Sequence, residues 1–191
     1  MVISVSINGV IRDVLSRFEE IYEKYEGKKV LSPVITPNLM EYVEFKDEDA
    51  LLDFLYNDAT MEIFGQAKEI ESSIISHLVE LYKDSPNDYI LRIVSDELGK
   101  SKPSTLWFLA KYGLVCDEIV FYTKTTIKEL WGNTDVFITA DIDIIENKPE
   151  DKKLIVVDRI YNENMVSDLR VKSIKEIKSF KDACEEIITV E

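Results

Sequence analysis

The chain has 191 residues, of which 46% are hydrophobic, and this is enough for one packed domain or for a domain with a modest insertion. The 37 acidic and 23 basic side chains leave a net charge of −14. This acidity argues against a nucleic acid or an anionic membrane as the main partner, because proteins that bind those surfaces neutralise phosphate groups with lysine and arginine.

The amino-terminal segment predicts a buried strand that runs through a glycine turn into a helix. The strand is the apolar run that begins at Val2, and Gly9 marks the turn. Apolar residues at three- and four-residue spacing predict a helix from Gly9 to about Tyr25, which Gly27 is expected to end. Two prolines punctuate residues 30–40, which we expect to form a loop.

Two further helices are predicted before the second strand. The first spans about residues 47–56, and the second spans about residues 60–82 with an apolar stripe that is typical of core packing. Polar residues and a proline cluster over residues 84–88 and predict a turn. Residues 28–86 are therefore predicted to be a small helical insertion.

From residue 89 onward, the pattern predicts strands and helices in alternation. The expected strands are 89–94, 118–122, 136–138 and 154–157, and the expected helices are 104–112, 126–130 and 174–184. Strands this apolar are buried on both faces, which is typical of a parallel sheet between helices. We therefore predict an α/β fold with a Rossmann-like parallel sheet, formed by residues 1–27 and 87–191. Ligands of such folds bind at the carboxyl ends of the strands, which are here Ser6–Asn8, Ser95–Glu97, Thr123–Lys124 and Thr139–Asp143.

Few other groups suggest a separate chemistry. Cys116 and Cys184 lie far apart without a CxxC spacing, so neither a zinc site nor a disulfide framework is expected. The sole histidine, His77, is expected at the surface or at the edge of the core. The sequence begins directly with a strand rather than a signal peptide, and no apolar run approaches the ~20 residues of a membrane span. These features predict a reduced, cytoplasmic protein.

Five short stretches at the strand ends form an ordered set. Ser6–Asp13 reads Ser-Ile-Asn-Gly-Val-Ile-Arg-Asp, and it is followed by Ile93–Ser95, by Lys124, by Asp135–Ala140 and by Val156–Asn162. In their order and spacing these stretches resemble the motifs of the haloacid dehalogenase (HAD) superfamily, and most nearly those of its 5'(3')-deoxyribonucleotidases. The resemblance spans nearly the whole chain. It implies a HAD-like core, with the insertion at the place of the family's small cap domain.

The resemblance also implies that the family's catalytic acids are replaced. In the family, the first motif supplies an aspartate nucleophile and an aspartate acid/base, and the fourth supplies an acidic pair that helps to hold Mg²⁺. The matching residues here are Ser6, Asn8, Thr139 and Ala140. An amide transfers no proton near neutral pH, and a magnesium site normally needs one or two carboxylates. We therefore expect no phosphotransfer activity and no cofactor.

Three matched or neighbouring residues leave alternatives open. Ser95 matches the phosphate-binding residue of the second motif and Lys124 the lysine of the third. Either they still form a phosphate pocket, or Ser95 completes a strand end and Lys124 is a surface charge. Asp141 is a weak candidate metal ligand if its loop is shifted inward, and it is otherwise a solvated turn acid.

Three functions are consistent with these observations. The first is a catalytically inactive HAD-like protein used as a protein-binding or structural assembly module, with a protein partner and no nucleic acid or membrane. Relatives of this nucleotidase group occur in bacteria and bacteriophages, so a virion component is one form of this hypothesis. The second is a nucleotide or phosphate sensor built on Ser95 and Lys124. The third is a residual Mg²⁺-dependent 5'-deoxyribonucleotidase that uses Asp141 with Asp96.

Overall fold

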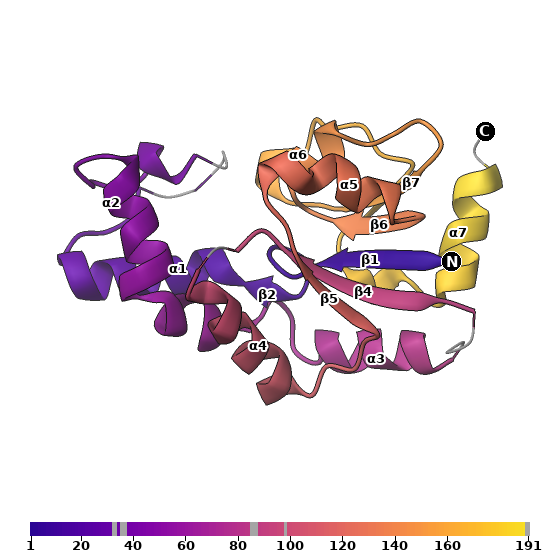
Figure 1. Cartoon of the computed structure of the whole chain (residues 1–191), viewed down its shortest axis with the longest axis horizontal. Coiled ribbons are helices and arrows are strands. Elements are labelled where there is room, and N and C mark those ends of the chain that lie inside the picture. Colours follow the sequence, from indigo (N-terminus) through magenta and orange to yellow (C-terminus); the bar gives the residue numbers. More distant parts are fainter. Residues whose placement is uncertain (32–33, 35–37, 85–87, 98, 190–191) are drawn as a thin grey trace.

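The core is a six-stranded parallel sheet with helices on both faces, and a helical lobe lies beyond one end of the strands (Figure 1). The computed structural model describes residues 1–31, 34, 38–84, 88–97 and 99–189. The strand order is β5-β4-β1-β6-β7-β8, which confirms the predicted Rossmann-like α/β class. The strands are β1 (Val2–Ser6), β4 (Ile90–Ser95), β5 (Glu118–Phe121), β6 (Val136–Thr139), β7 (Lys153–Val157) and β8 (Leu169–Val171).

Apolar side chains cover both faces of the sheet because successive residues of a strand point to opposite sides. On one face, Ile3 and Val5 of β1 pack with α3 (Ile74–Lys83), α4 (Ser101–Tyr112) and α7 (Phe180–Thr189). On the other face, Phe137 and Val156 pack with α5 (Ile127–Gly132) and α6 (Ile142–Glu146). Burial on both faces explains why the central strands are almost continuously apolar.

A separate apolar cluster holds the lobe together. Helix α1 (Val14–Glu26) contributes Phe18 and Tyr22, and they pack with residues of α2 (Glu48–Asp53) and of two π-helical turns, η2 (Phe54–Asp58) and η3 (Met61–Gly65). The short strands β2 (Arg12–Asp13) and β3 (Lys68–Glu69) pair in antiparallel orientation between the lobe and the sheet. The lobe thus contains the first helix of the chain, whereas α3, from the predicted insertion, packs against the sheet. Short 3₁₀ turns complete the chain at η1 (Leu39–Glu41), η4 (Lys124–Thr126), η5 (Ile160–Asn162) and η6 (Ile174–Glu176).

Several predicted elements differ from the structure. The first helix begins at Val14 rather than Gly9, because Gly9 adopts a left-handed conformation with φ of 74°. A single helix over residues 60–82 is wrong, because the chain leaves the helical path after Gly65 and turns again at Ser73, where φ is 63°. The final predicted helix is divided into η6 and α7. Of the predicted turn, residues 85–87 lie outside the described part of the chain.

Candidate functional site

The carboxyl ends of β4, β1 and β6 lie side by side at the edge of the sheet that faces the lobe (Figure 1). Ser6 ends β1, Ser95 ends β4 and Thr139 ends β6. Because β1 lies between the other two strands, the parallel topology brings these ends together, as expected for the ligand site of an open α/β sheet. The matched motif positions therefore belong to one region of the molecule.

Ser6 and Thr139 are joined to each other by a buried hydrogen bond. Their hydroxyl oxygens lie 2.7 Å apart, and both side chains are almost completely buried. The Thr139 hydroxyl also accepts a hydrogen bond from the backbone N–H of Asp141 at 3.0 Å. Ala140 is buried as well, and its carbonyl accepts a hydrogen bond from the amide of Asn162 at 3.2 Å. The hydroxyl of Ser6 therefore faces another hydroxyl rather than a general base.

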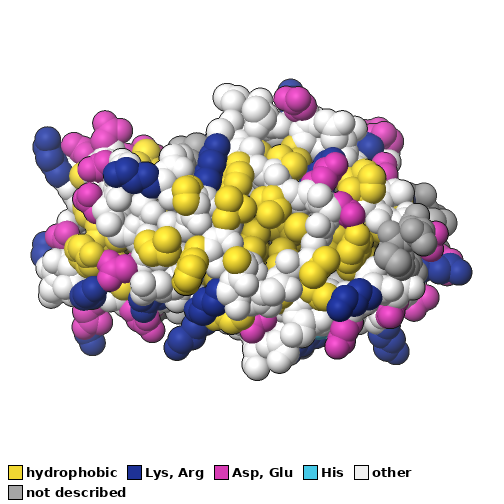
Figure 2. Space-filling model, turned by 60° about the horizontal axis from the view of Figure 1, so that its bottom comes forward, with side chains coloured by type: hydrophobic (Ala, Val, Ile, Leu, Met, Phe, Trp, Pro, Cys, Tyr) yellow, Lys and Arg dark blue, Asp and Glu magenta, His cyan; other side chains and the backbone are white. Residues whose placement is uncertain are grey.

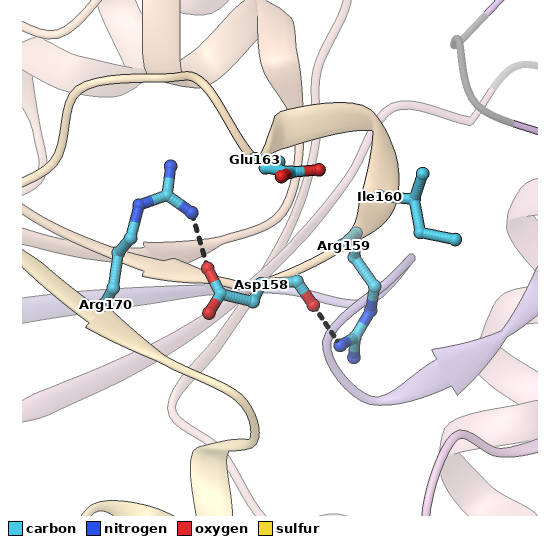
Figure 3. A pocket seen from close by; sticks show the side chains of 5 residues that line it. All are labelled: Asp158, Arg159, Ile160, Glu163 and Arg170. Atoms are coloured by element: carbon cyan, nitrogen blue, oxygen red, sulfur yellow. Dashed lines mark hydrogen bonds and ion pairs between the residues drawn. The ribbon is translucent and has the colours of Figure 1, made fainter.

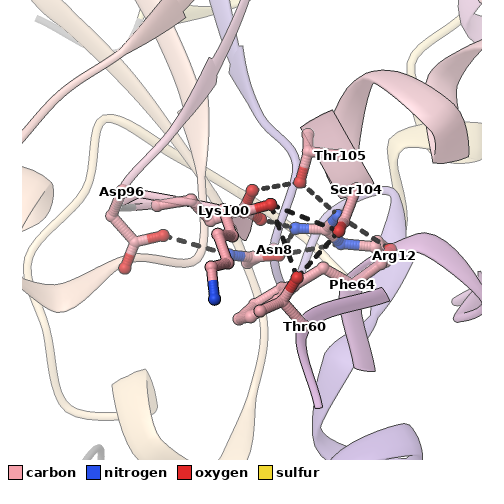
Figure 4. Close-up of polar contacts among 9 residues, drawn as sticks. Asn8, Arg12, Thr60, Phe64, Asp96, Lys100, Ser104 and Thr105 are labelled. Atoms are coloured by element: carbon pink, nitrogen blue, oxygen red, sulfur yellow. Dashed lines mark hydrogen bonds and ion pairs between the residues drawn. The ribbon is translucent and has the colours of Figure 1, made fainter. Parts of the chain in front are cut away.

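Asn8 bridges a cation and an anion through the two ends of its amide (Figure 4). Its oxygen accepts hydrogen bonds from Nη2 and Nε of Arg12 at 2.6 and 3.1 Å, and its nitrogen donates to Asp96 at 3.0 Å. An aspartate at this position would accept from Arg12 equally well, but it would place a second negative charge against Asp96. The amide thus suits this environment better than the carboxylate of the family motif does.

Arg12 is completely buried and joins three parts of the fold. Its guanidinium forms an ion pair with the buried carboxylate of Glu97 and donates to the carbonyl of Phe64 at 3.1 Å and to the Thr105 hydroxyl at 2.7 Å. The hydroxyl of Thr105 in turn donates to Glu97. Burial lowers the pKa of Arg12, and the charge of Glu97 opposes this effect. The guanidinium carbon of Arg12 also lies 5.2 Å from the centre of the Phe64 ring and 5.3 Å from the centre of the Phe108 ring.

Arg12 was not among the residues that the sequence singled out for the site, and Glu97 was included only as the last residue of the Ser95–Glu97 strand end. Arg12 stands at a variable position of the first motif, and Glu97 is one of two neighbouring acids after β4. One signal was available, because Arg12 directly follows the apolar pair Val10 and Ile11. A charge in such an apolar segment indicates a partner of opposite sign, since an unpaired buried charge is costly.

Asp141 serves as the amino-terminal cap of α6. Its Oδ1 accepts from the backbone N–H groups of Asp143 and Ile144 at 2.8 and 3.4 Å, and its Oδ2 accepts a hydrogen bond from the Tyr122 hydroxyl. Loss of hydration raises the pKa of Asp141 to about 6, and the charge of Asp96 adds to this shift. Both oxygens are therefore engaged within the protein.

Asp96 is the second acid at this edge of the sheet. Its side chain is exposed at the surface, yet the surrounding protein removes water from its carboxyl group. This desolvation, and to a smaller extent the negative charge of Glu97, raises the pKa of Asp96. The described residues contain no group of three or more histidine, cysteine, aspartate or glutamate side chains placed to hold a metal ion. Asp96 and Asp141 make the region electronegative.

Ser95 and Lys124 lie in different environments. Ser95 is buried, and its hydroxyl has no hydrogen-bond partner within the described part of the chain. The side chain of Lys124 is 84% exposed, and its ammonium lies 3.0 Å from the carboxylate of Asp143. The structure does not show them sharing a polar contact. His77 is half-buried at the edge of the core, with a ring nitrogen 3.0 Å from the carbonyl of Ile177.

A shallow pocket lies beyond the end of β7, beside the candidate site (Figure 3). Arg170 forms an ion pair with Asp158 at 2.5 Å, and Arg159 donates to the backbone carbonyl of Asp158. Glu163 and Ile160 complete the lining. Two cations thus stand beside two acids, so the pocket has little net charge.

Comparisons with known proteins identify no family for this chain. No protein-family model matches it, and a search of the curated proteins finds no relative. Within the described ranges, no helix is long and apolar enough to cross a membrane. Any functional assignment therefore depends on the chemistry of the residues themselves.

Proposed function

We propose that this protein is a HAD-like protein without phosphotransfer chemistry, and that it serves as a protein-binding or assembly module. One observation carries the proposal: neutral side chains occupy the four positions that match the family's acids, and three of them bond within the protein framework. Ser6 bonds to Thr139, and Asn8 is held between Arg12 and Asp96.

The surroundings of these residues disfavour each step of the family's reaction. A serine attacks phosphorus only when a base activates it, and the partner of Ser6 is the hydroxyl of Thr139. A phosphate group would approach the carboxylates of Asp96 and Asp141, while the ammonium of Lys124 is paired with Asp143 at the surface. The negative charges of the phosphate and of these carboxylates repel each other, which opposes binding unless a metal ion or another cation neutralises them. This electronegative region also disfavours a phosphate sensor.

Exposed apolar side chains on α4 support a binding role. This helix buries Phe108 and Leu109 against the sheet, yet Leu106 and Trp107 on its opposite side are 45% and 57% exposed. Figure 2 shows apolar side chains gathered along the middle of one face of the molecule. A helix that is apolar on both sides normally has a partner on each, and exposed tryptophan is common at protein interfaces. A virion component, if the chain is phage-encoded, is one form of such a module.

Phosphate release from a panel of deoxynucleoside monophosphates with Mg²⁺ tests the catalytic half of the proposal. We expect the native protein to release no more phosphate than a blank, with or without a chelator. The control is Asp141→Asn, which removes one of the two acids, Asp141 and Asp96, that the residual-hydrolase alternative uses. Turnover by the native protein that is lost both on chelation and in Asp141→Asn would refute the proposal.

A further inference from the structure

The edge strand β5 presents an apolar surface to solvent. No strand of the described residues pairs with its outer side, so half of its backbone N–H and C=O groups have no sheet neighbour there. Ile119 is 39% exposed, and Phe121 is half-buried. Natural proteins normally protect such an edge with a charge, a proline or a covering segment, because an open edge accepts a further strand. The one charge on β5 is Glu118 at its first residue; the remaining three residues, Ile119, Val120 and Phe121, are apolar.

Helix α4 extends this surface along the same side of the sheet. Ile119 and Phe121 are aligned with Ile93 and Ser95 of β4, and Ile93 packs in the cluster that contains Phe108 of α4. The ammonium of Lys102 lies 5.4 Å from the centre of the Phe121 ring. Leu106 follows Lys102 by one turn on the same stripe of α4. We call Lys102, Leu106, Asp117, Ile119 and Phe121 the β5 edge patch.

The charges of the β5 edge patch are arranged in a self-complementary way. Asp117 is exposed just before the strand, where its carboxylate accepts hydrogen bonds from the Tyr82 hydroxyl at 2.7 Å and from the backbone N–H of Leu91 at 2.8 Å and keeps its negative charge. Lys102 lies over Phe121 at the other end of the strand. If two copies pair in antiparallel orientation with Ile119 opposite Ile119, Asp117 of each copy faces Phe121 of the other, beside Lys102. This contact between Asp117 of one copy and Lys102 of the other occurs twice, as a two-fold axis requires.

The other strand pair in this register contains no like charges. In this register Glu118 faces Val120, and Glu118 is already paired with Arg92 at 2.7 Å. A parallel arrangement would instead place Asp117 beside Asp117, which costs energy. An unrelated partner would need to supply an apolar strand with both charges in the matching order, whereas a second copy supplies them by symmetry.

We propose that a second copy of this chain binds at the β5 edge patch, so that the two sheets join through antiparallel β5 strands. Backbone hydrogen bonds along the edge, apolar contact between the Ile119 side chains and two Lys102–Asp117 ion pairs stabilise the pair. The inference goes beyond the absence of catalysis, because self-association and phosphate release are measured independently.

Light scattering after size-exclusion chromatography, over a series of protein concentrations, tests the proposal. We expect the mass to rise from 22.1 kDa towards twice that value as the concentration increases. Ile119→Lys places a charge in the middle of the apolar edge and should weaken the association by roughly tenfold or more. The matched control is Ile160→Lys, because Ile160 is also an exposed isoleucine, 63% accessible, and lies away from β5. The control should associate as the native protein does.

A pair of charge reversals tests the register. Lys102→Glu and Asp117→Lys should each weaken self-association, since each puts like charges together twice. When the two variants are mixed, every contact again joins opposite charges, so heterodimers should form. Thermal melts establish that each variant is folded, and Lys102→Glu with Ile119→Lys suffices if Asp117→Lys does not fold. A single-chain mass at every concentration would overturn the proposal, as would dissociation caused by Ile160→Lys or unchanged association in Ile119→Lys.

Discussion

Arg12 shows how one residue can serve the fold at a position where chemistry is expected. It follows the turn after β1, and its guanidinium nitrogens donate hydrogen bonds to Asn8, Phe64, Glu97 and Thr105. A buried ion pair of this kind adds little net stability compared with an apolar pair, but the loss of one partner is costly. The amide at position 8 is therefore coupled to Arg12, since its oxygen accepts hydrogen bonds from the guanidinium.

Glu97→Leu tests this coupling. The substitution leaves the Arg12 charge buried without its carboxylate, so we expect the free energy of unfolding to fall by about 3–5 kcal/mol. The double variant Arg12→Met with Glu97→Leu removes both charges and should lose less stability than Glu97→Leu alone. Urea unfolding of both single variants and the double variant gives the coupling energy. Additive effects would show that the two side chains act independently.

Asp141→Asn tests how much stability the protein loses by ionising a desolvated carboxyl group. The raised pKa, about 6 in the folded protein against about 3.9 for a free aspartate, means that the charged form is disfavoured by folding. Below pH 4 both states hold the proton and the cost is absent; as the pH rises, the unfolded state ionises first, and above about 6 the cost is complete. Asparagine keeps an oxygen that can cap α6 without the charge.

We therefore expect Asp141→Asn to be more stable than the native protein by about 1–2 kcal/mol at pH 8, a figure reduced for the partial exposure of the group. The difference should shrink as the pH falls through 6 towards 4. Urea unfolding of both proteins at several pH values provides the measurement. A difference that does not change with pH would contradict the raised pKa.

At the scale of the elements, strands were easier to predict than helix boundaries. The strands β1, β4, β6 and β7 can be recognised in the sequence as apolar runs, because both of their faces are buried. The helix predicted over 60–82 failed because apolar spacing alone does not reveal the left-handed backbone at Ser73 or the short strand β3. The ends of β4, β1 and β6 lie together in the sheet, as the sequence predicted. The hydrogen bonds around them were not predicted, because Glu97 and Thr105 reach Arg12 only through tertiary packing.

The turn after β1 allows a matched comparison of two glycines. Gly9 and Gly27 both have positive φ, of 74° and 67°, but a Cβ on Gly9 would lie 2.7 Å from the Tyr161 hydroxyl, whereas one on Gly27 would have no neighbour within 4 Å. Gly27→Ala should therefore cost only the backbone strain, about 1 kcal/mol, and Gly9→Ala should cost about 1–2 kcal/mol more. Tyr161→Phe should recover part of the extra cost. Equal losses of thermal stability in the two alanine variants would argue against the close contact.

At the scale of the whole molecule, acidity dominates the surface. The net charge of −14 opposes the compact state through self-repulsion, while the ion pairs at the surface are mostly exposed and individually weak. Composition alone predicts this property. The arrangement of the basic residues on α4, with Lys102 over Phe121, required the structure.

The dependence of stability on salt measures the balance between the repulsion among the acidic side chains and the attraction within the surface ion pairs. Raising the ionic strength from roughly 0.01 M to roughly 0.15 M shortens the Debye length from ~30 Å to ~8 Å, which weakens the general repulsion between acids. We expect the melting temperature to rise over this range when it is measured at a concentration where the chain is a monomer. Sodium and potassium chloride should act alike. A falling melting temperature would mean that the surface ion pairs outweigh the repulsion.

The position of Arg12 has a consequence for modularity. One apolar cluster lies in the lobe and two others lie on the two faces of the sheet, an arrangement that suggests a lobe and a sheet domain that could be separated. Arg12 prevents this, because it bonds to a carbonyl of the lobe, to a hydroxyl of α4 and to a carboxylate behind β4 within one buried site. Removal of the lobe would take away the carbonyl of Phe64, and removal of α4 would take away the hydroxyl of Thr105. Either deletion would leave the guanidinium of Arg12 without one of its hydrogen-bond acceptors. We therefore expect the lobe and the sheet to unfold together, so that a partner bound to the lobe would also stabilise the sheet.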